Sequence, residues 1–414
     1  MLNGVDGDGR MASAPGETPD RIAGMRLDSA TSADRLPQLC DLATEGLKRM
    51  ILPDLRVAHT MRSVGNRNGS GTTAEGDNLR YAANVAQGLG WLPEQVQRDV
   101  LGGWTAIDLA LNCVERARIS GEPGAVALSA WAAAETAGVY TPDLFAILSM
   151  ALSSPTAIHT VPCAWALTAA LAARHLGDTS EVQRLATAKL RQGQSASGLF
   201  PHVLPSDSAG WIRRHIGSFA DQVYPIQALS RLSAANGDRE ALRAANACAA
   251  RIVLLQGSAG QWWWHYDTRD GQVVEGYPVY SVHQHAMAPM ALLDLLDAGG
   301  VDYRAALAKG LRWIDNRPET KQPMVSEADG TIWRKVGRSE PSKLARKLGA
   351  FTTAVSPGLH VPYIDTVLPA NKVDRECRPY EFGWMLYAWR SHGVIDQLRR
   401  TGSKSSATGL KFRD

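Results

Sequence analysis

The sequence predicts an all-α protein, a closed ring of six helical hairpins of the type called an (α/α)6 toroid. Long stretches rich in Ala and Leu carry apolar residues at helical spacing, whereas the alternation typical of strands is scarce. A unit of about 63 residues recurs in the middle of the chain. Helix pairs of this kind bury their apolar faces only by stacking on neighbours, so they form a ring or, alternatively, an open solenoid.

The chain begins with residues 1–35, which are rich in Gly, Asp, Ser and Ala and hold few large apolar groups. We expect a disordered extension there, because so little apolar surface cannot offset the entropy of ordering. The segment also lacks the basic-then-apolar order of a secretory signal. The toroid is expected over residues 36–400, with a flexible tail over residues 401–414.

Helical periodicity then marks the elements of the ring in order. The clearest stretches are residues 79–89, 126–137, 164–176, 240–255 and 303–314. The first helices of six pairs are expected to begin near Asp77, Gly124, Pro162, Pro225, Pro289 and Tyr380. Residues 334–379 form a long irregular stretch before the last pair, and this stretch is placed to cross the mouth of the ring.

Three prolines show the repeat most clearly. Pro162, Pro225 and Pro289 each lead into an Ala/Leu helix, and the steps between them are 63 and 64 residues. Proline suits the first turn of a helix, where its missing N–H is not needed, and a kink inside a longer helix is the other interpretation.

A loop with a glycine and an aromatic residue follows the second helix of each repeated unit. Gln194, Gly198 and Phe200 stand in the first loop, and Gln256, Gly260 and Trp262 take the same spacing in the second. The third loop has Glu327, Gly330 and Trp333.

The first two loops resemble the QW repeat of squalene–hopene-type terpenoid cyclases, in which the Gln caps a helix end and stacks on the Trp. The resemblance covers about residues 190–333 and implies the toroid, but the DxDD and DDxxD motifs of cyclases and synthases are absent. The aromatic loop of residues 260–267 is also similar to loops of six-hairpin glycosidases, and the same ring serves polysaccharide lyases and epimerases.

The amino-acid composition limits the kinds of partner that the protein is expected to bind. Basic and acidic residues number 44 and 41, the net charge is +3, and charges of both signs are interspersed, so no nucleic acid is expected as a partner. No apolar run reaches the roughly 18 residues of a membrane span. The five cysteines are widely spaced without a CxxC pair, which is typical of reduced thiols in a cytoplasmic protein. We expect no cofactor and no metal.

The repeat also indicates a site. Asp221 and His285 each stand four residues before a repeated proline, so both are expected at the same end of the ring on adjacent inner helices. A carboxylate and an imidazole on neighbouring walls form an acid–base set, and Glu381 opens the last inner helix as a third catalytic candidate. The alternative for each is a polar cap of a helix start.

Further polar and aromatic side chains are expected to bind a substrate. His283 and His285 form an HxH pair, but on a helix they point about 200° apart and cannot share a metal.

The three successive tryptophans alternate in direction. In an extended segment Trp263 faces away from Trp262 and Trp264. The expected binding residues are Trp263, His265, Tyr280, His283, Arg80 and Trp384.

These features favour a carbohydrate-active enzyme, a hydrolase, lyase or epimerase that acts on an oligosaccharide or a uronate within the toroid. The mixture of Trp, Tyr, His, Arg and carboxylate at the mouth is the reason, because terpene pockets are usually drier. A terpenoid-cyclase-like enzyme with a divergent acid is the second hypothesis. A non-catalytic toroid that binds a glycan or a protein is the third.

Overall fold

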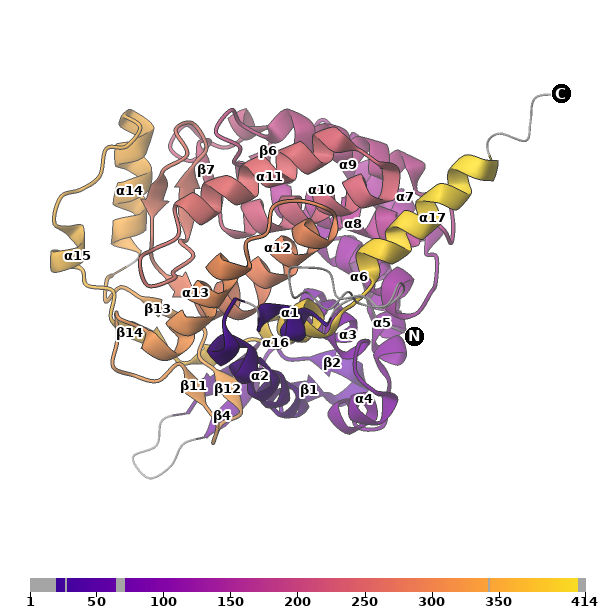
Figure 1. The fold of residues 1–414 in the computed structure, drawn as a ribbon, viewed down its shortest axis with the longest axis horizontal. Helices are drawn as coiled ribbons and strands as arrows, with labels where there is room; N and C mark the ends of the chain where they lie inside the picture. Colours follow the sequence, from indigo (N-terminus) through magenta and orange to yellow (C-terminus); the bar gives the residue numbers. More distant parts are fainter. Residues whose placement is uncertain (1–19, 27, 65–70, 342, 409–414) are drawn as a thin grey trace, which may run out of the picture.

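A computed structural model describes residues 20–26, 28–64, 71–341 and 343–408. Six helices form an inner ring in which each contacts the next and the last contacts the first (Figure 1). They are α3 (Leu79–Leu89), α6 (Pro123–Thr136), α8 (Thr160–Ala173), α10 (Ala220–Asn236), α12 (Ala288–Asp297) and α16 (Pro379–Arg390). The ring is therefore closed, which confirms the toroid and excludes the open solenoid. The six helices begin close to the six starts that the sequence predicts.

An outer layer of helices returns the chain from each inner helix to the next. Its members are α5 (Ala106–Ser120), α7 (Pro142–Ser153), α9 (Ser180–Gly193), α11 (Arg239–Leu254) and α13 (Arg304–Asn316). The sixth outer position belongs to α2 (Ala30–Lys48), which comes from the start of the chain and packs on α16. The last hairpin thus pairs helices from opposite ends of the sequence.

The inner helices are apolar on all sides because both of their faces are covered. In α6 and α8 nearly every residue is buried, and alanine is the commonest residue in both. Small residues let these helices approach closely. A Cβ atom at Gly88 of α3 would lie 2.3 Å from the backbone oxygen of Gly383 in α16, so both glycines are needed where the ring closes.

Short strands fill the connections that lead into the inner helices, so they gather at the end of the ring where those helices begin, here called the N-terminal end. Three sheets have three strands, in the orders β7–β8–β9, β10–β13–β14 and β15–β3–β4, and the other three sheets are strand pairs. The strands are β1 (Ile51–Leu52), β2 (Arg56–Val57), β3 (Thr60–Ser63), β4 (Thr72–Glu75), β5 (Ile158–His159), β6 (Val203–Leu204), β7 (Ile216–Ser218), β8 (His265–Asp267), β9 (Val273–Glu275), β10 (Val279–Tyr280), β11 (Val325–Ser326), β12 (Thr331–Ile332), β13 (Lys335–Gly337), β14 (Lys372–Asp374) and β15 (Glu376–Cys377).

The other helical segments lie at the ends and on the flank of the ring. They are α1 (Arg21–Met25), α4 (Glu94–Leu101), α14 (Leu344–Val355), α15 (Ile364–Val367), α17 (Val394–Thr408), the 3-10 turns η1 (Pro53–Leu55) and η2 (Ser206–Ser208), and the π turn η3 (His283–Met287). Among the described residues, none of the helices combines the length and hydrophobicity that a bilayer-spanning segment needs.

The repeated prolines occupy both of the positions that the sequence allowed. Pro162 lies in the first turn of α8, whereas Pro225 lies inside α10. Pro289 lies in the first turn of α12, but the π turn η3 runs directly into that helix.

The glycine–aromatic loops join each hairpin to the next outer helix. The Gln194 side-chain amide donates to the carbonyl oxygens of Gly198, at 2.8 Å, and of Ala244 in α11, at 2.9 Å. Gln256 repeats this arrangement with Gly260, at 3.1 Å, and with Ala306 in α13, at 3.0 Å. The repeated Gln is thus a clasp between hairpins. The likeness of these loops to those of terpenoid cyclases stays a resemblance of sequence.

The third loop makes the equivalent connection with different residues and closes the outer layer. Gly330 packs against Gly46 of α2, where a Cβ atom would lie 2.2 Å from the Gly330 carbonyl oxygen. Arg49 donates to the carbonyl oxygen of Asp329 at 2.8 Å, in the place of the Gln clasp.

The N-terminal segment differs from its prediction. Residues 1–19 and 27 lie outside the described residues, but residues 20–26 and 28–35 are part of the fold rather than of a disordered extension. Arg21 of α1 is buried and forms ion pairs with Asp294, at 2.6 Å, and Asp297, at 2.8 Å. Ile22 and Met25 enter the main core. The few apolar residues of this segment suffice because a buried ion pair anchors it. Of the predicted tail, residues 401–408 continue α17, and residues 409–414 are not described.

The loop tryptophans are expected to seal the helix pairs. Trp262 is fully buried and Trp333 is 5% exposed. Replacement of either by alanine should lower the free energy of unfolding by about 3–5 kcal/mol, because a large cavity remains. Urea denaturation would measure the loss. Trp104→Ala, at a position 54% exposed, is the control and should change stability by about 0.5 kcal/mol or less. Unchanged stability in both loop variants would contradict the sealing role.

The tight packing of the loop that carries Gly260 predicts that one added methyl group there lowers the free energy of unfolding substantially. Gly260 and Gly103 have nearly the same backbone angle, with φ values of 102° and 101°. A Cβ at Gly260 would lie 2.1 Å from the Lys309 carbonyl oxygen, whereas nothing lies within 4 Å of one at Gly103. Gly103→Ala should therefore cost only the strain of a positive φ, about 1–2 kcal/mol. Gly260→Ala should cost about 1–3 kcal/mol more in urea denaturation. Equal losses would show that the loop adapts freely.

Candidate active site

A buried carboxyl group lies at the N-terminal end of the ring. Glu381, in the first turn of α16, is fully buried, and neither of its side-chain oxygens has a hydrogen-bond partner among the described residues. The nearest cation is Arg334, whose Nε lies 3.7 Å from Glu381 Oε1. Burial raises the pKa of Glu381 to about 8. The group is therefore mostly protonated at neutral pH and is able to donate a proton.

Two arginines stand beside this acid. The Arg334 guanidinium lies 5.0 Å from the centre of the Tyr280 ring. Arg378, which precedes α16, donates to the Tyr81 hydroxyl of α3 at 2.9 Å. The Nε atoms of both arginines are buried without a hydrogen-bond partner in the described part of the chain. Both guanidinium groups also pair with Glu376, at 3.7 Å from Arg334 and 3.4 Å from Arg378. A neutral acid and two incompletely bonded cations form a set that a polar, anionic ligand would complete.

A second acidic group lies at the start of α10. Asp221 is fully buried, and its Oδ2 accepts hydrogen bonds from the backbone N–H and the hydroxyl of Ser218, both at 2.7 Å. The same oxygen lies 2.9 Å from His202 Nδ1. This hydrogen bond and the negative charge of Asp221 raise the pKa of His202. Because the His202 side chain is 46% exposed, its other ring nitrogen is available to exchange protons.

The loop that carries His202 is held by the next residue of α10. Gln222 accepts from the Phe200 N–H at 2.8 Å and donates to the Phe200 carbonyl at 2.9 Å. His202 also pairs with the ring of His159, which ends β5, at 4.7 Å between ring centres. The imidazole thus has a fixed position relative to Asp221. Ser218 and Asp221 bond each other reciprocally, since the Asp221 N–H also donates to the Ser218 hydroxyl at 3.3 Å. Asp221 therefore also has the capping role that was the alternative interpretation.

Aromatic rings connect the starts of α10 and α12. His283 lies 4.3 Å from Phe219, 5.0 Å from Tyr280 and 6.0 Å from Trp264 between ring centres. Burial lowers the pKa of His283 to about 3, so this ring is neutral. His265 stacks on Trp264 at 5.0 Å, and burial lowers its pKa as well. Tyr280, His265 and His283 therefore form part of one aromatic wall at this end of the ring.

Among the described residues, His285 forms no hydrogen bond with Asp221. Neither ring nitrogen of His285 has a hydrogen-bond partner among the residues described, and burial lowers its pKa to about 3. The reason is the π turn over His283–Met287, which holds an extra residue per turn. Counting back from Pro289 therefore does not give a position equivalent to Asp221. The imidazole that Asp221 binds is His202, which the sequence reasoning missed.

Three predicted binding residues have other surroundings. The Trp263 indole donates to the Leu255 carbonyl oxygen at 2.7 Å, beyond the end of outer helix α11, so Trp264 rather than Trp263 faces the aromatic wall. Arg80 pairs with Glu122 at 2.5 Å, between the starts of α3 and α6. Trp384 is fully buried and donates to the Tyr224 hydroxyl at 2.9 Å.

The residues that the sequence did not identify share one property. His202, Arg334 and Arg378 come from the connections before the inner helices, where periodicity carries no information. One signal was present, because His202 follows the first glycine–aromatic loop by two residues, and that loop has a fixed place in the repeat. In the part of the chain that the structure describes, no group of three or more His, Cys, Asp or Glu side chains is placed to hold a metal ion.

Comparison with known proteins identifies the architecture. No family model and no curated protein matches this sequence. Among solved structures, an unsaturated glucuronyl hydrolase specific for heparin is similar with a TM-score of 0.55 and 12% identity, over 88% of this chain and 98% of that one. A possible GH105 family member from Salmonella enterica has a TM-score of 0.53 and 12% identity, over 97% and 100% of the two chains. This chain therefore shares its toroid fold with these two structures. At these identities the likeness is one of fold.

The raised pKa of Glu381 predicts a pH dependence of stability. An unfolded Glu titrates near 4.3, whereas the folded group titrates at about 8. Between these pH values the folded state binds the additional proton, so the free energy of unfolding should fall as pH rises. The Gln side chain of Glu381→Gln is neutral at every pH. This variant should therefore lack the decrease in the free energy of unfolding that Glu381 causes, which is about 1.4 kcal/mol for each unit of difference between the two pKa values.

Chemical denaturation between pH 5 and 8 would measure the effect. Glu327→Gln, which changes an exposed loop carboxylate, is the control and should keep the pH profile of the unaltered protein. If Glu381→Gln also kept that profile, Glu381 would not be a buried neutral acid.

Proposed function

We propose that this protein is a carbohydrate-active enzyme, a hydrolase or lyase that acts on an acidic oligosaccharide at the N-terminal end of the ring. The observation that carries the proposal is Glu381, a buried and mostly neutral acid beside the incompletely bonded Arg334 and Arg378. Cleavage of a glycosidic bond needs a proton donor for the leaving oxygen, and a carboxyl group with a raised pKa is suited to that role.

The other polar groups have complementary roles in this proposal. His202, oriented by Asp221, accepts a proton from the attacking water in a hydrolase or from a sugar carbon in a lyase. Arg334 and Arg378 bind the carboxylate of a uronate, for which planar guanidinium groups are the best match. The aromatic wall of Trp264 and Tyr280 offers flat faces to the sugar rings.

The similar structures support the same class of substrate. One of them is an unsaturated glucuronyl hydrolase from Streptococcus agalactiae, similar with a TM-score of 0.50 and 12% identity over 94% of this chain and 99% of that one. The heparin-specific hydrolase is another. Both names describe enzymes of acidic sugars, and the arginines beside Glu381 are the feature of this chain that fits such a substrate.

The cyclase alternative is less well supported by the same geometry. A cyclase must stabilise carbocations, and Arg334, 3.7 Å from the acid, would repel positive charge there. The non-catalytic alternative makes a different prediction from the proposed enzyme, because a toroid that only binds would retain a glycan without converting it.

A panel of acidic and neutral oligosaccharides tests the proposal. Turnover would be followed by new reducing ends and by the ultraviolet absorbance of unsaturated uronates. Glu381→Gln and His202→Gln should fold normally and lose about 100- to 10,000-fold in kcat, the range typical of general acid and base groups. Activity should also fall above pH 8, where Glu381 loses its proton. Asp221→Asn should lower the pKa of His202 and shift the pH profile of activity accordingly.

His360→Gln, on an exposed segment, is the matched control and should retain full activity. Binding of an acidic oligosaccharide without turnover would favour the non-catalytic alternative. Turnover that survives in both Glu381→Gln and His202→Gln would place the chemistry elsewhere.

A further inference from the structure

Helix α14, in the stretch before the last inner helix, is packed with its large apolar residues outward. Its inward face consists of Ala345, Gly349, Ala350 and Thr353, which are all buried. Gly349 lies so close to β9 that a Cβ atom would come within 3.1 Å of the Val274 carbonyl oxygen. The orientation of the helix is therefore fixed by small residues.

The outward face of α14 is an apolar stripe. Leu344, Leu348, Phe351 and Val355 recur at intervals of four, three and four residues, and they are 40%, 36%, 49% and 61% exposed. Trp211, which is 56% exposed, extends this surface and meets Phe351 edge to face at 6.0 Å. Globular proteins rarely expose so many large apolar groups side by side without a binding purpose.

Positive charge flanks the stripe. Lys343, Arg346 and Lys347 lie on α14 or directly before it, and residues 343–355 include no Asp or Glu. Arg213 lies close enough to Arg346 that the two charges influence each other. Among the described side chains, these four cations form no ion pair, in contrast to most arginines of the protein. An apolar stripe beside unpaired cations is the pattern of a helix that lies in the interface of an anionic bilayer.

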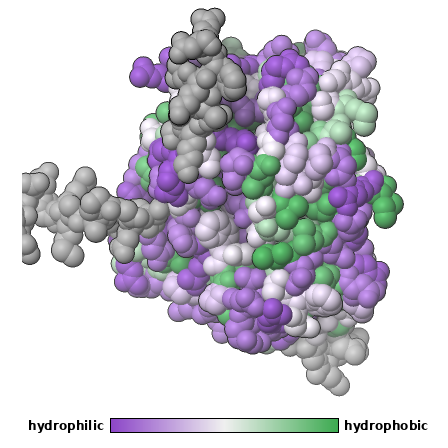
Figure 2. Space-filling view, turned by 90° about the vertical axis from the view of Figure 1, so that its right-hand side faces the viewer, coloured by the Kyte–Doolittle hydropathy of each residue, from purple (hydrophilic) through white to green (hydrophobic). Residues whose placement is uncertain are grey.

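We propose that α14 and Trp211 dock this protein on an anionic lipid surface. Charge favours lipid over a second copy of the chain, because self-association through this face would bring unpaired cations together with no acid on either helix. The opposite side of the molecule is a useful comparison. Apolar residues also reach the surface there (Figure 2), but α5 on that side carries Asp108 and Glu115 in the same helix as its exposed apolar groups.

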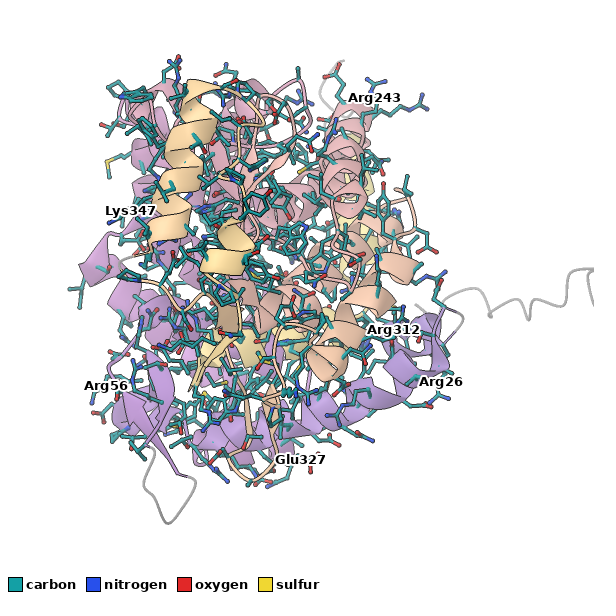
Figure 3. All side chains as sticks on the ribbon, turned by 90° about the vertical axis from the view of Figure 1, so that its left-hand side faces the viewer. Arg26, Arg56, Arg243, Arg312, Glu327 and Lys347 are labelled. Carbon is teal, nitrogen blue, oxygen red and sulfur yellow. The ribbon has the colours of Figure 1, made fainter. Side chains whose placement is uncertain are left out.

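The docking surface lies near the candidate active site. Helix α14 packs on β9, and β9 shares a sheet with β7, whose Ser218 holds Asp221. Figure 3 shows Lys347 at the same edge of the molecule as Arg56, which lies in the connection before α3. Arg243 and Arg312 project near the opposite edge. Docking through α14 would bring the N-terminal end of the ring close to the bilayer.

Vesicle sedimentation of the full chain tests the proposal. The protein should sediment with vesicles of equal parts phosphatidylglycerol and phosphatidylcholine, and much less with phosphatidylcholine alone. The double variant Leu348→Ser, Phe351→Ser should lower the partition coefficient about tenfold or more, because it removes apolar side chains from the interface. Lys347→Glu should lower it roughly tenfold, and high salt should weaken binding of the unaltered protein.

Matched controls lie on other faces. Ile107→Ser changes a residue of α5 that is 47% exposed, close to the value for Phe351, and Arg243→Glu reverses an exposed charge far from α14. Both should bind vesicles as the unaltered protein does, and circular dichroism should show all variants folded. Equal binding by the α14 variants and the controls would overturn the proposal. Failure of the unaltered protein to bind either kind of vesicle would also overturn the proposal. If the unaltered protein does not bind vesicles but forms a dimer that Leu348→Ser, Phe351→Ser abolishes, the α14 face is an interface between two copies of the chain.

Discussion

The contact between α16 and α3 is the constraint on which the rest of the structure depends. These helices come from opposite parts of the chain, and their backbones touch at Gly88 and Gly383, where no side chain fits. The contact turns a row of hairpins into a closed ring, so no apolar inner face is left at either end of the row. It also brings Arg378 to Tyr81 and places Glu381 where it is covered on all sides. The raised pKa of the acid is thus a consequence of ring closure.

The other end of the ring holds a buried polar network. Asp294 of α12 binds Arg231 at 2.7 Å and Arg21 at 2.6 Å, and Arg231 also binds Glu135 at 3.1 Å. Tyr387 joins the same group by a hydrogen bond from Arg231 at 2.5 Å. Loss of one member would leave a buried charge without its partner, which is more costly than loss of a surface pair. The contrast with Glu381 is informative, because the carboxylates of this end are hydrogen-bonded to arginines, whereas neither side-chain oxygen of Glu381 has a hydrogen-bond partner among the described residues.

The sequence predicted the architecture better than the site, and particular residues show why. A repeat of about 63 residues and helical periodicity report on packing that every hairpin shares, so the starts of all six inner helices could be predicted. Glu381 and Asp221 were placed correctly at two of these starts. His285 lies in a π turn, which alters its angular position relative to Pro289 without altering its count in the sequence. The alternation of the three tryptophans was also correct, since Trp262 lies beside Phe219 and Trp264 beside His283, and these two rings are neighbours. Trp264 rather than Trp263 packs beside Tyr280 and His283, because alternation does not tell which side faces inward.

Arg21 and α14 show a further limit, since both depend on a partner distant in the sequence. Arg21 looks like one charge in a polar extension until Asp294 is found 273 residues away. Residues 334–379 were expected to be irregular, but the structure has the helix α14 within them. Gly349 and Ala350 of this helix pack against β9, so its larger apolar side chains are turned outward. A helix packed in this way keeps its large apolar groups available, and its cations stay unpaired because no acid lies on the same helix. The proposed chemistry at the N-terminal end and the proposed adsorption through α14 thus use different side chains on one scaffold. The sheet β7–β8–β9 is what they share, since it carries Ser218 and His265 in its strands and supports α14 through β9.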